Sequence, residues 1–307
     1  MCSKTQTPPS TAPSWANLDR LREALDRADA MVIGAGSGLS AAAGFDYDGT
    51  RFRTYFADFE ARYGFHDMYT GGFFPFRDRG EFWAYWSRYI WINRYQDPPR
   101  PVYRDLLALA EGRDHFVLTT NVDHCFQRAG FDKKRLFYTQ GDYGLWQCSK
   151  PCHCRTYDNE EAVRQMLAAQ GFRLTGRELE PPVGGAPGRS VPAGLLPRCP
   201  VCGAPMVPNL RTDDTFVQDE GWYAAAGRYE DFLRRHRAGR VLYWELGVGY
   251  NTPAIIKYPF WRLTAQNPHA RYACVNRDSD ACPPELGERA IPVRGDLGTV
   301  LRALLHT

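Results

Sequence analysis

The sequence has no apolar run that could cross a membrane. Nowhere in its 307 residues are about 18 or more consecutive residues apolar, which excludes a transmembrane helix. Residues 1–14 are polar and proline-rich and lack the apolar core of a signal peptide. We therefore expect a flexible tail over residues 1–15, and a cytoplasmic protein that does not bind a membrane.

The sequence also lacks a strong excess of charge of either sign. The formal net charge is +3, and the arginines are scattered rather than gathered in a basic run, so we do not expect nucleic acid as a partner. Hydrophobic residues make up 44% of the chain and charged residues 24%, as in ordinary soluble globular proteins. A chain of this length suits one large domain that carries a smaller one.

Cysteines, by contrast, are numerous. Nine of them in a chain without a signal peptide indicate a reducing compartment, and metal binding rather than disulfides. Two pairs, Cys148 with Cys152 and Cys199 with Cys202, supply four thiolates for a tetrahedral Zn²⁺. Four cysteine ligands leave no open position for a water molecule, so we expect the zinc to be structural.

The cysteine spacing departs from the usual zinc ribbon in two respects. The first pair is one residue wider than usual, and the gap between the pairs exceeds the usual ~15–20 residues. Cys154 is therefore a possible substitute ligand, whereas His153 is expected to point outward. The alternative interpretation is a set of free, reduced cysteines.

The rest of the chain alternates strands with helices. Apolar runs predict strands at residues 30–33, 115–119, 241–246, 271–276 and 290–293. A strand, a Gly-rich turn and an Ala-rich helix follow one another at the start, as in a doubly wound parallel sheet. The cysteines interrupt this rhythm. The expected fold class is therefore α/β, with a Rossmann-like sheet and an inserted small zinc-binding domain.

The Gly-rich loop at residues 34–44 is a candidate nucleotide site. Its glycines allow a close backbone approach and leave helix N–H groups pointing at a phosphate, although many such turns bind nothing. An ordinary NAD dehydrogenase has an acidic ribose ligand about 20 residues further on. Asp46 and Asp48 come too early for that role, which disfavours hydride transfer.

Asn121 and Asp123 follow the predicted strand at residues 115–119. Parallel sheets place their ligands at the carboxyl ends of the strands, which makes both residues candidates for ligand contacts. The alternative is that they cap the helix that runs to Ala129.

Residues 45–96 are rich in aromatic side chains, with the highest density from Phe82 to Tyr95. Core packing is the commonest role of such side chains. A wall of a cleft, wide enough for an apolar arm, is the alternative.

These ordered motifs together resemble those of the sirtuins, from about Ala30 to Leu305. Residues 36–44 resemble the sirtuin Gly-Ala-Gly-x-Ser…Ser-Gly-Ile loop, and residues 119–123 resemble its Thr-Gln-Asn-Ile-Asp. Residues 247–249, 275–276 and 295–296 fall where the family has a Gly-Thr-Ser turn, an Ile-Asn step and a Gly-Asp step.

The resemblance implies an NAD-binding Rossmann-like domain over residues 16–140 and 216–307. An aromatic helical insertion at about residues 50–100 would belong to it, and residues 141–215 would form a small zinc-ribbon domain. NAD would be the co-substrate and Zn²⁺ a structural ion. The implied cofactor-binding residues are Gly34, Ala35, Gly36, Ser37, Gly38, Ser40, Gly44, Phe45, Asp46, Arg53, Thr120, Gly247, Val248, Gly249, Asn276 and Asp296.

Three segments depart from the sirtuin pattern. Gln140 stands where the family has the histidine of a His-Gly step, and an amide cannot take up a proton near neutral pH. Residues 46–53 replace a Pro-x-Phe-Arg motif. Residues 209–214 replace the Val-Val-x-Phe-Gly-Glu strand that pairs with an acetyl-lysine peptide.

These departures resemble the macrodomain-linked branch of sirtuins, class M. That resemblance implies ADP-ribosyl transfer to a lipoylated carrier protein similar to the glycine-cleavage H protein, with a macrodomain hydrolase that reverses the modification. Asn121 and Asp123 would hold the nicotinamide amide and the ribose. Gln140 would orient a ribose hydroxyl or the acceptor.

The chemistry of the acceptor favours the same activity. Deacylation needs a base, and the loss of that base reduces the rate roughly a hundred- to ten-thousand-fold. Transfer of ADP-ribose to a carboxylate needs no base, because the carboxylate acceptor is already ionised. The alternatives are a deacylase with another base, an NAD hydrolase, and a non-catalytic NAD-binding module.

Overall fold

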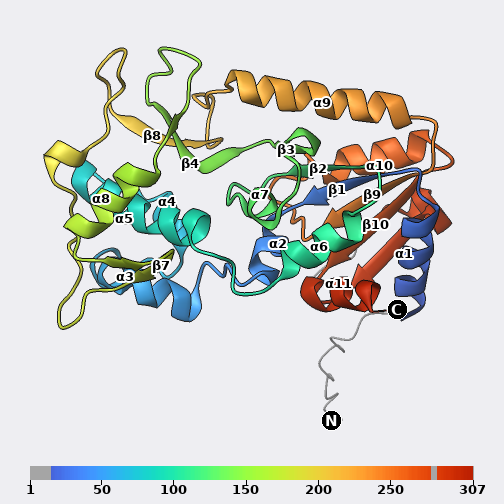
Figure 1. Ribbon diagram of the computed structural model, residues 1–307, viewed down its shortest axis with the longest axis horizontal. Coiled ribbons are helices and arrows are strands. Elements are labelled where there is room, and N and C mark those ends of the chain that lie inside the picture. Colours follow the sequence, from blue (N-terminus) through green and yellow to red (C-terminus); the bar gives the residue numbers. More distant parts are fainter. Residues whose placement is uncertain (1–14, 278–281, 307) are drawn as a thin grey trace, which may run out of the picture.

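The computed structural model describes residues 15–277 and 282–306, which form two lobes joined side by side (Figure 1). Nearly all of the expected tail, residues 1–14, lies outside the described residues. Within the described part of the chain, no helix is both long and apolar enough to cross a membrane.

The larger lobe is built on a six-stranded parallel sheet in the order β11-β10-β9-β1-β2-β3. This confirms the expected doubly wound fold. The strands are β1 (Ala30–Ala35), β2 (His115–Thr119), β3 (Leu136–Tyr138), β9 (Val241–Leu246), β10 (Arg271–Asn276) and β11 (Ala290–Arg294).

Helices cover both faces of this sheet because alternate residues of each strand point to opposite sides. In β1, Met31 and Ile33 belong to one core, and Ala30 and Val32 to the other. The first core includes residues of α1 (Trp15–Arg27), α2 (Ser37–Ala42), α6 (Val102–Ala110), α7 (Cys125–Ala129) and α11 (Leu297–Leu305). The second includes residues of α9 (Glu220–His236), α10 (Lys257–Gln266) and η4 (Pro284–Arg289). The short η2 (Lys133–Arg135) precedes β3.

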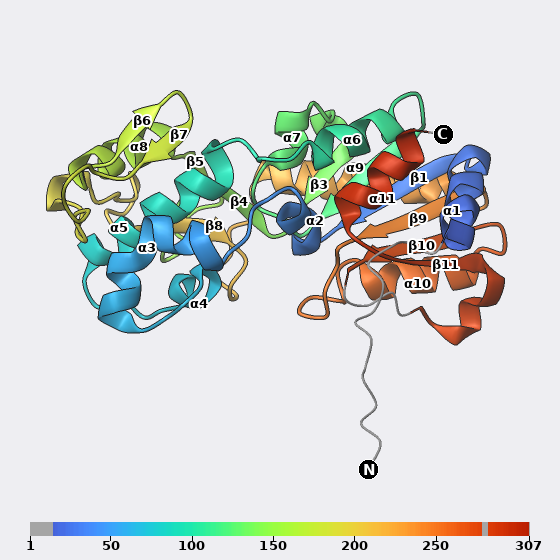
Figure 2. The same cartoon turned by 90° about the horizontal axis from the view of Figure 1, so that it is seen from below.

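The smaller lobe contains an antiparallel sheet in the order β5-β4-β8, and of the paired cysteines Cys148 ends β4 while the other three lie in loops. Its elements are β4 (Gly141–Cys148), β5 (Tyr157–Asp158), α8 (Glu160–Ala169), the hairpin β6 (Arg173–Thr175) with β7 (Glu178–Glu180), η3 (Ala193–Leu195) and β8 (Met206–Leu210). Figure 2 shows this lobe beside the parallel sheet, with β4 leading across from the larger lobe.

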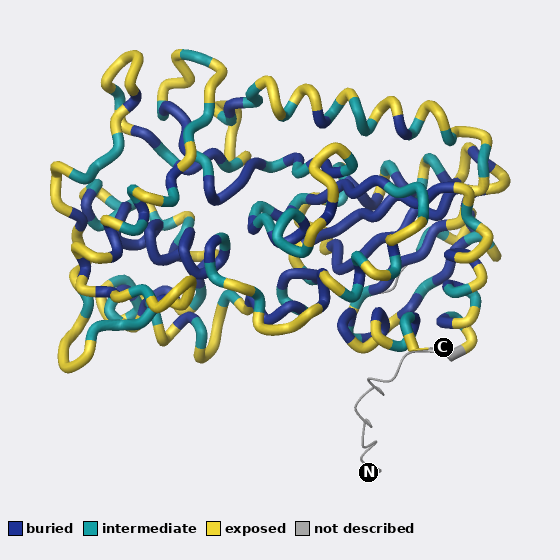
Figure 3. Tube along the Cα trace, in the orientation of Figure 1, coloured by how far each residue is buried: buried dark blue, intermediate teal, exposed yellow. Residues whose placement is uncertain are grey.

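The aromatic segment forms α3 (Gly49–Tyr63), α4 (Met68–Gly72), α5 (Arg79–Ile90) and the π-helix η1 (Trp91–Tyr95). Its side chains share one core with the cysteine-bearing sheet, where the rings of Trp83 and Trp146 lie 4.9 Å apart. The aromatic segment therefore does not form part of the NAD-binding domain, contrary to the prediction from the sequence, because its core lies in the other lobe. In Figure 3, α5 is accordingly buried along most of its length.

Candidate active site

The glycine-rich loop after β1 packs directly against the turn after β9. The amides of Gly36 and Gly38 donate hydrogen bonds to the carbonyls of Leu246 and Gly247, at 3.0 and 2.9 Å. A Cβ on Gly36 would lie 2.7 Å from the Gly247 oxygen, and Gly247 has a φ of +61°. Glycine permits both the close approach and the positive φ. The two turns therefore form one rigid floor.

The loop after β2 places Asn121 and Asp123 at the carboxyl edge of the sheet, where parallel sheets bind their ligands. Nδ2 of Asn121 donates to the Gly36 carbonyl at 2.9 Å and to the Tyr103 hydroxyl at 3.3 Å. Asn121 is buried. Its side chain is therefore fixed against the glycine loop.

Asp123 is buried, and both of its carboxylate oxygens accept hydrogen bonds. The Ser40 hydroxyl donates to Oδ2, and the Cys125 amide donates to Oδ1 at 3.0 Å. Burial raises the pKa of Asp123, because a water-poor surrounding disfavours the ionised form. The alternative, in which Asn121 and Asp123 cap α7, is not what the structure shows: His124 is the N-cap residue and no side chain caps the helix, although Asp123 accepts from the amide of Cys125, its first residue.

A cleft of about 460 Å³ opens above these turns. Its lining combines polar groups of the larger lobe with aromatic side chains of the smaller one. The lining residues are Gly36, Ser37, Ser40, Tyr47, Tyr69, Gly72, Phe73, Trp86, Tyr89, Thr120, Asn121, Val122, Asp123, Gln140, Tyr143, Leu210, Arg211, Thr212, Val248, Gly249, Asn251 and Thr252.

Gln140 lies in the turn between β3 and β4, where its carbonyl accepts a hydrogen bond from the Arg211 amide at 3.0 Å. It lines the cleft together with Asn121 and Asp123. The structure thus brings together all three residues that the sequence placed at the reacting centre. Of the three, only Asp123 has an ionisable side chain, and both of its carboxylate oxygens already accept hydrogen bonds.

The predicted cofactor-binding residues divide into two groups. Those that line the cleft are Gly36, Ser37, Ser40, Thr120, Val248 and Gly249. Those that do not line it are Gly34, Ala35, Gly38, Gly44, Phe45, Asp46, Arg53, Gly247, Asn276 and Asp296.

Several residues of the second group have structural contacts instead. A Cβ on Gly34 would lie 2.4 Å from Ile256, so this glycine makes room for the packing of the second core. Asp296 caps α11 by accepting a hydrogen bond from the Thr299 amide at 2.9 Å. Arg53 is exposed on α3.

Arg51 was not predicted, although it makes the inward contacts of this segment. Its Nη1 donates to the Asn93 side chain at 2.8 Å and to the Asp46 carbonyl at 3.1 Å, and its Nη2 donates to the Ile92 carbonyl at 2.7 Å. Arg51 thereby fastens the chain after the glycine loop to η1. Arg51 and Arg53 lie two residues apart on α3, and no sequence motif shows which of them makes these contacts.

Three tyrosine hydroxyls form a second feature that the sequence did not reveal. The Tyr143 hydroxyl lies 3.2 Å from that of Tyr47 and donates to that of Tyr89 at 3.0 Å. Burial raises the pKa of all three phenols, so they remain neutral. They give the aromatic part of the cleft a chain of polar groups drawn from three separate segments.

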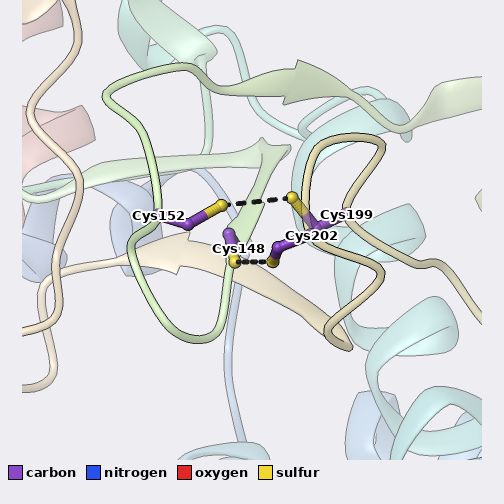
Figure 4. Close-up of side chains that lie close together, drawn as sticks. All are labelled: Cys148, Cys152, Cys199 and Cys202. Atoms are coloured by element: carbon purple, nitrogen blue, oxygen red, sulfur yellow. Dashed lines mark hydrogen bonds between the residues drawn. The ribbon is translucent and has the colours of Figure 1, made fainter.

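The side chains of the paired cysteines point toward one another and bring their four sulfur atoms together (Figure 4). The sulfur atoms of Cys148 and Cys202 lie 3.6 Å apart, as do those of Cys152 and Cys199. Four Zn–S bonds of 2.3 Å in a tetrahedron separate the sulfurs by about 3.8 Å. The predicted donor set therefore fits a structural Zn²⁺.

The remaining ligand candidates behave differently from each other. Cys154 is exposed and lies outside the group of four sulfurs, so it does not substitute for a ligand. His153, which was expected to point outward, is half-buried and lies outside the group of four sulfurs, but its ring contacts one of them. Its Nε2 lies 3.4 Å from the Cys199 sulfur and 3.3 Å from the Tyr157 hydroxyl.

Comparison with known proteins gives relatives for nearly the whole chain, while no protein-family model matches it. The protein ADP-ribosyltransferase of Staphylococcus aureus (strain Mu50) is 38% identical over 287 residues, which cover 93% of this chain and 86% of the relative. A probable bifunctional ADP-ribose hydrolase/ADP-ribosyltransferase of Fusarium oxysporum f. sp. cubense is 28% identical over 323 residues, which cover 99% of this chain and 50% of that protein.

Solved structures show the same fold. A crystal structure of a Sir2 homologue in complex with NAD aligns over 94% of this chain and 92% of its own, with a TM-score of 0.53 and 16% identity. A Sir2 enzyme structure aligns over 95% of this chain and 97% of its own, with a TM-score of 0.55 and 17% identity. The chain has the sirtuin fold and belongs to the protein ADP-ribosyltransferase family, as an NAD-dependent enzyme.

Proposed function

We propose that this enzyme transfers ADP-ribose from NAD to a lipoylated carrier protein similar to the glycine-cleavage H protein, as a member of the macrodomain-linked branch of sirtuins. The observation that carries the proposal is Gln140, which lines the cleft beside Asn121 and Asp123. An amide at this position cannot remove the ribose proton that deacylation requires. Transfer to an ionised acceptor does not need that step.

The contacts in the cleft suggest a role for each residue. Asn121 has its Nδ2 engaged by two protein acceptors, which directs its carbonyl oxygen to donors such as the nicotinamide amide or a ribose hydroxyl. Asp123 carries the charge that stabilises a cation-like ribose as nicotinamide departs. Gln140 orients a ribose hydroxyl or the acceptor.

The aromatic part of the cleft suits an apolar arm. Tyr69 and Phe73 of the lining are 54% and 59% exposed, and their rings lie 4.8 Å apart. Trp86 and Tyr89 continue the aromatic lining inward. An extended acyl arm could bury its apolar length there and bring its carrier to the cleft mouth.

The proposal includes a hydrolase partner and a compartment. The Fusarium relative is by its name both a probable ADP-ribose hydrolase and an ADP-ribosyltransferase, which supports a macrodomain hydrolase as the partner that removes the modification. Buried free thiols such as Cys125 and Cys274 suit a reducing compartment, in line with a cytoplasmic location.

The test uses NAD labelled in its adenylate half, mixed with the enzyme and with carrier protein in lipoylated and unlipoylated form. We expect label on the lipoylated carrier, little on the unlipoylated one, and none with Asn121→Ala. Equal labelling of both carriers would show that the lipoyl arm is not required for recognition. Undiminished transfer by Asn121→Ala would show that the cleft is not the site of the reaction.

The alternative is NAD-dependent deacylation. Solved structures with this fold include a Sir2 enzyme bound to an acetylated peptide. NAD-dependent conversion of an acyl-lysine peptide to the peptide with an unmodified lysine, at a higher rate than label transfer, would favour this alternative.

A further inference from the structure

His124 lies outside the cleft lining but follows Asp123 directly, and it has an unusual backbone. Its φ is +64° and its ψ is 13°. Among the residues that the structure describes, it is the single non-glycine with a positive φ. Few residues other than glycine adopt this left-handed conformation, although histidine, asparagine and aspartate do so more often than the rest, and it persists where the surrounding structure holds it.

The side chain of His124 explains what holds it there. Its Nδ1 lies 2.7 Å from Oδ2 of Asp142, which is buried and two residues beyond Gln140. Burial alone would raise the pKa of Asp142, but the hydrogen bond from His124 and the charge of Arg94 outweigh it and hold that pKa below its ordinary value. The carboxylate is thus an acceptor, and Nδ1 of His124 carries the hydrogen.

Asp142 is itself fixed from two other directions. Nε of Arg94, in η1, lies 2.6 Å from its Oδ1, and the Gly144 amide donates to the same oxygen at 2.7 Å. A Cβ on Gly144 would lie 2.8 Å from that Arg94 nitrogen, so the missing side chain is what admits Arg94. The side chains of Arg94, His124 and Asp142 therefore form a joint that connects η1, the loop after β2 and the start of β4.

Backbone contacts run alongside this joint. The Tyr143 amide donates to the Val122 carbonyl at 2.9 Å. Nη1 of Arg128, in α7, donates to the carbonyls of Arg94 and Gln96 at 3.0 and 2.6 Å. The joint thus spans the boundary between the lobes, and Asp123 and Gln140 lie within two residues of it on either side.

We propose that His124 and Asp142, anchored by Arg94, are positioning residues that set Asp123 and Gln140 in register across the boundary between the lobes. Neither residue lines the cleft, so each acts through its neighbours. Loss of the His124–Asp142 bond would let the loop after β2 move relative to β4. A displacement of about 1 Å at reacting groups can reduce a rate on the order of a hundred-fold. This inference rests on the assignment of the cleft as the site of nicotinamide release.

Two substitutions separate the side-chain bond from the backbone conformation. His124→Gly removes the bond and suits the left-handed φ. His124→Asn also tolerates that φ and places an amide donor near the position of Nδ1. His236→Gly and His236→Asn are matched controls. His236 is the last residue of α9 and its ring also lies close to an aspartate, at 2.9 Å from Asp114, but it does not line the cleft.

The measurements are kcat and KM for nicotinamide release from NAD, with and without the lipoylated carrier, and hydrogen exchange over residues 121–125 and 140–143. For His124→Gly we expect kcat to fall about ten- to a hundred-fold with little change in KM, and exchange in both segments to accelerate. His124→Asn should recover most of both. The His236 variants should match the wild type.

Several outcomes would overturn the inference. It fails if His124→Gly exchanges and turns over like the wild type, or if the Gly and Asn variants lose activity equally. It also fails if only thermal stability changes. Asn121→Ala separates this failure from that of the proposed site: if Asn121→Ala abolishes release and His124→Gly does not, the cleft stands and the positioning role does not. If Asn121→Ala is fully active, both fall.

Discussion

Ser40 of the glycine loop donates a hydrogen bond to the buried carboxylate of Asp123, on the loop after the neighbouring strand. The contact joins the two turns that the sequence singled out separately. Under the proposed function, this carboxylate is the group that stabilises the cation-like ribose left by nicotinamide. The stability and the pH dependence of the enzyme should both reflect this buried carboxylate.

Asp123→Asn is expected to abolish nicotinamide release and to stabilise the fold at high pH. The pKa of Asp123 is raised in the folded state, so its contribution to stability is present below the unfolded value of about 3.9 and is lost as the pH rises through the raised value. The variant should therefore gain in melting temperature over the wild type at pH 8 and show little gain near pH 4. A difference independent of pH would contradict the assigned shift.

Gly247→Ala should destabilise the floor of the cleft. The added Cβ would lie 2.6 Å from the Gly38 carbonyl carbon, at a φ of +61°. We expect a loss of about 1–3 kcal/mol in the free energy of unfolding, together with weaker NAD binding by calorimetry. Gly249→Ala is the matched control for stability, because nothing lies within 4 Å of its added Cβ. Equal unfolding midpoints for both variants would refute the packing argument.

The purified enzyme should contain one zinc ion per chain, measured by elemental analysis. Cys148→Ser should remove the metal and lower the melting temperature, because the buried Cys148 belongs to the shared core of the smaller lobe. Cys154→Ser should keep both, since Cys154 lies outside the sulfur cluster. Zinc loss in the Cys154 variant would show that the ligand set is misassigned.

Gln140→Ala tests whether a proton moves at this position. If Gln140 only orients a hydroxyl, its removal costs one hydrogen bond of roughly 0.5–1.5 kcal/mol, or about a two- to twelve-fold loss in transfer rate. Gln140→His would add a group that titrates near pH 6.5, and NAD-dependent deacylation should then become measurable above that pH. A collapse of transfer in Gln140→Ala by a thousand-fold would assign Gln140 a larger role.

The sheet could be predicted from the sequence because its strands are short apolar runs between polar turns. Residues 115–119, 241–246 and 271–276 were predicted with the bounds of β2, β9 and β10. The 17-residue helix α9 was not predicted. It was missed although its apolar residues recur at helical spacing and pack against the second core; they are Trp222, Ala225, Ala226, Tyr229, Phe232 and Leu233.

The candidate site could be predicted where a motif is continuous in sequence. Asn121, Asp123 and Gln140 meet in one cleft because parallel strands end at a common edge. The bond between His124 and Asp142 could not be foreseen, since it depends on the packing of two lobes. The same is true of the aromatic segment, whose pattern shows that it is buried but does not show which core buries it.

The most direct test of the account combines NAD, the lipoylated carrier and an acyl-lysine peptide in one reaction with the wild-type enzyme. Intact-mass measurement follows the carrier, and chromatography follows the peptide. The account predicts that the carrier gains one ADP-ribose per nicotinamide released, while the peptide keeps its acyl group. An acyl group removed at the rate of nicotinamide release, with the carrier unmodified, would contradict it.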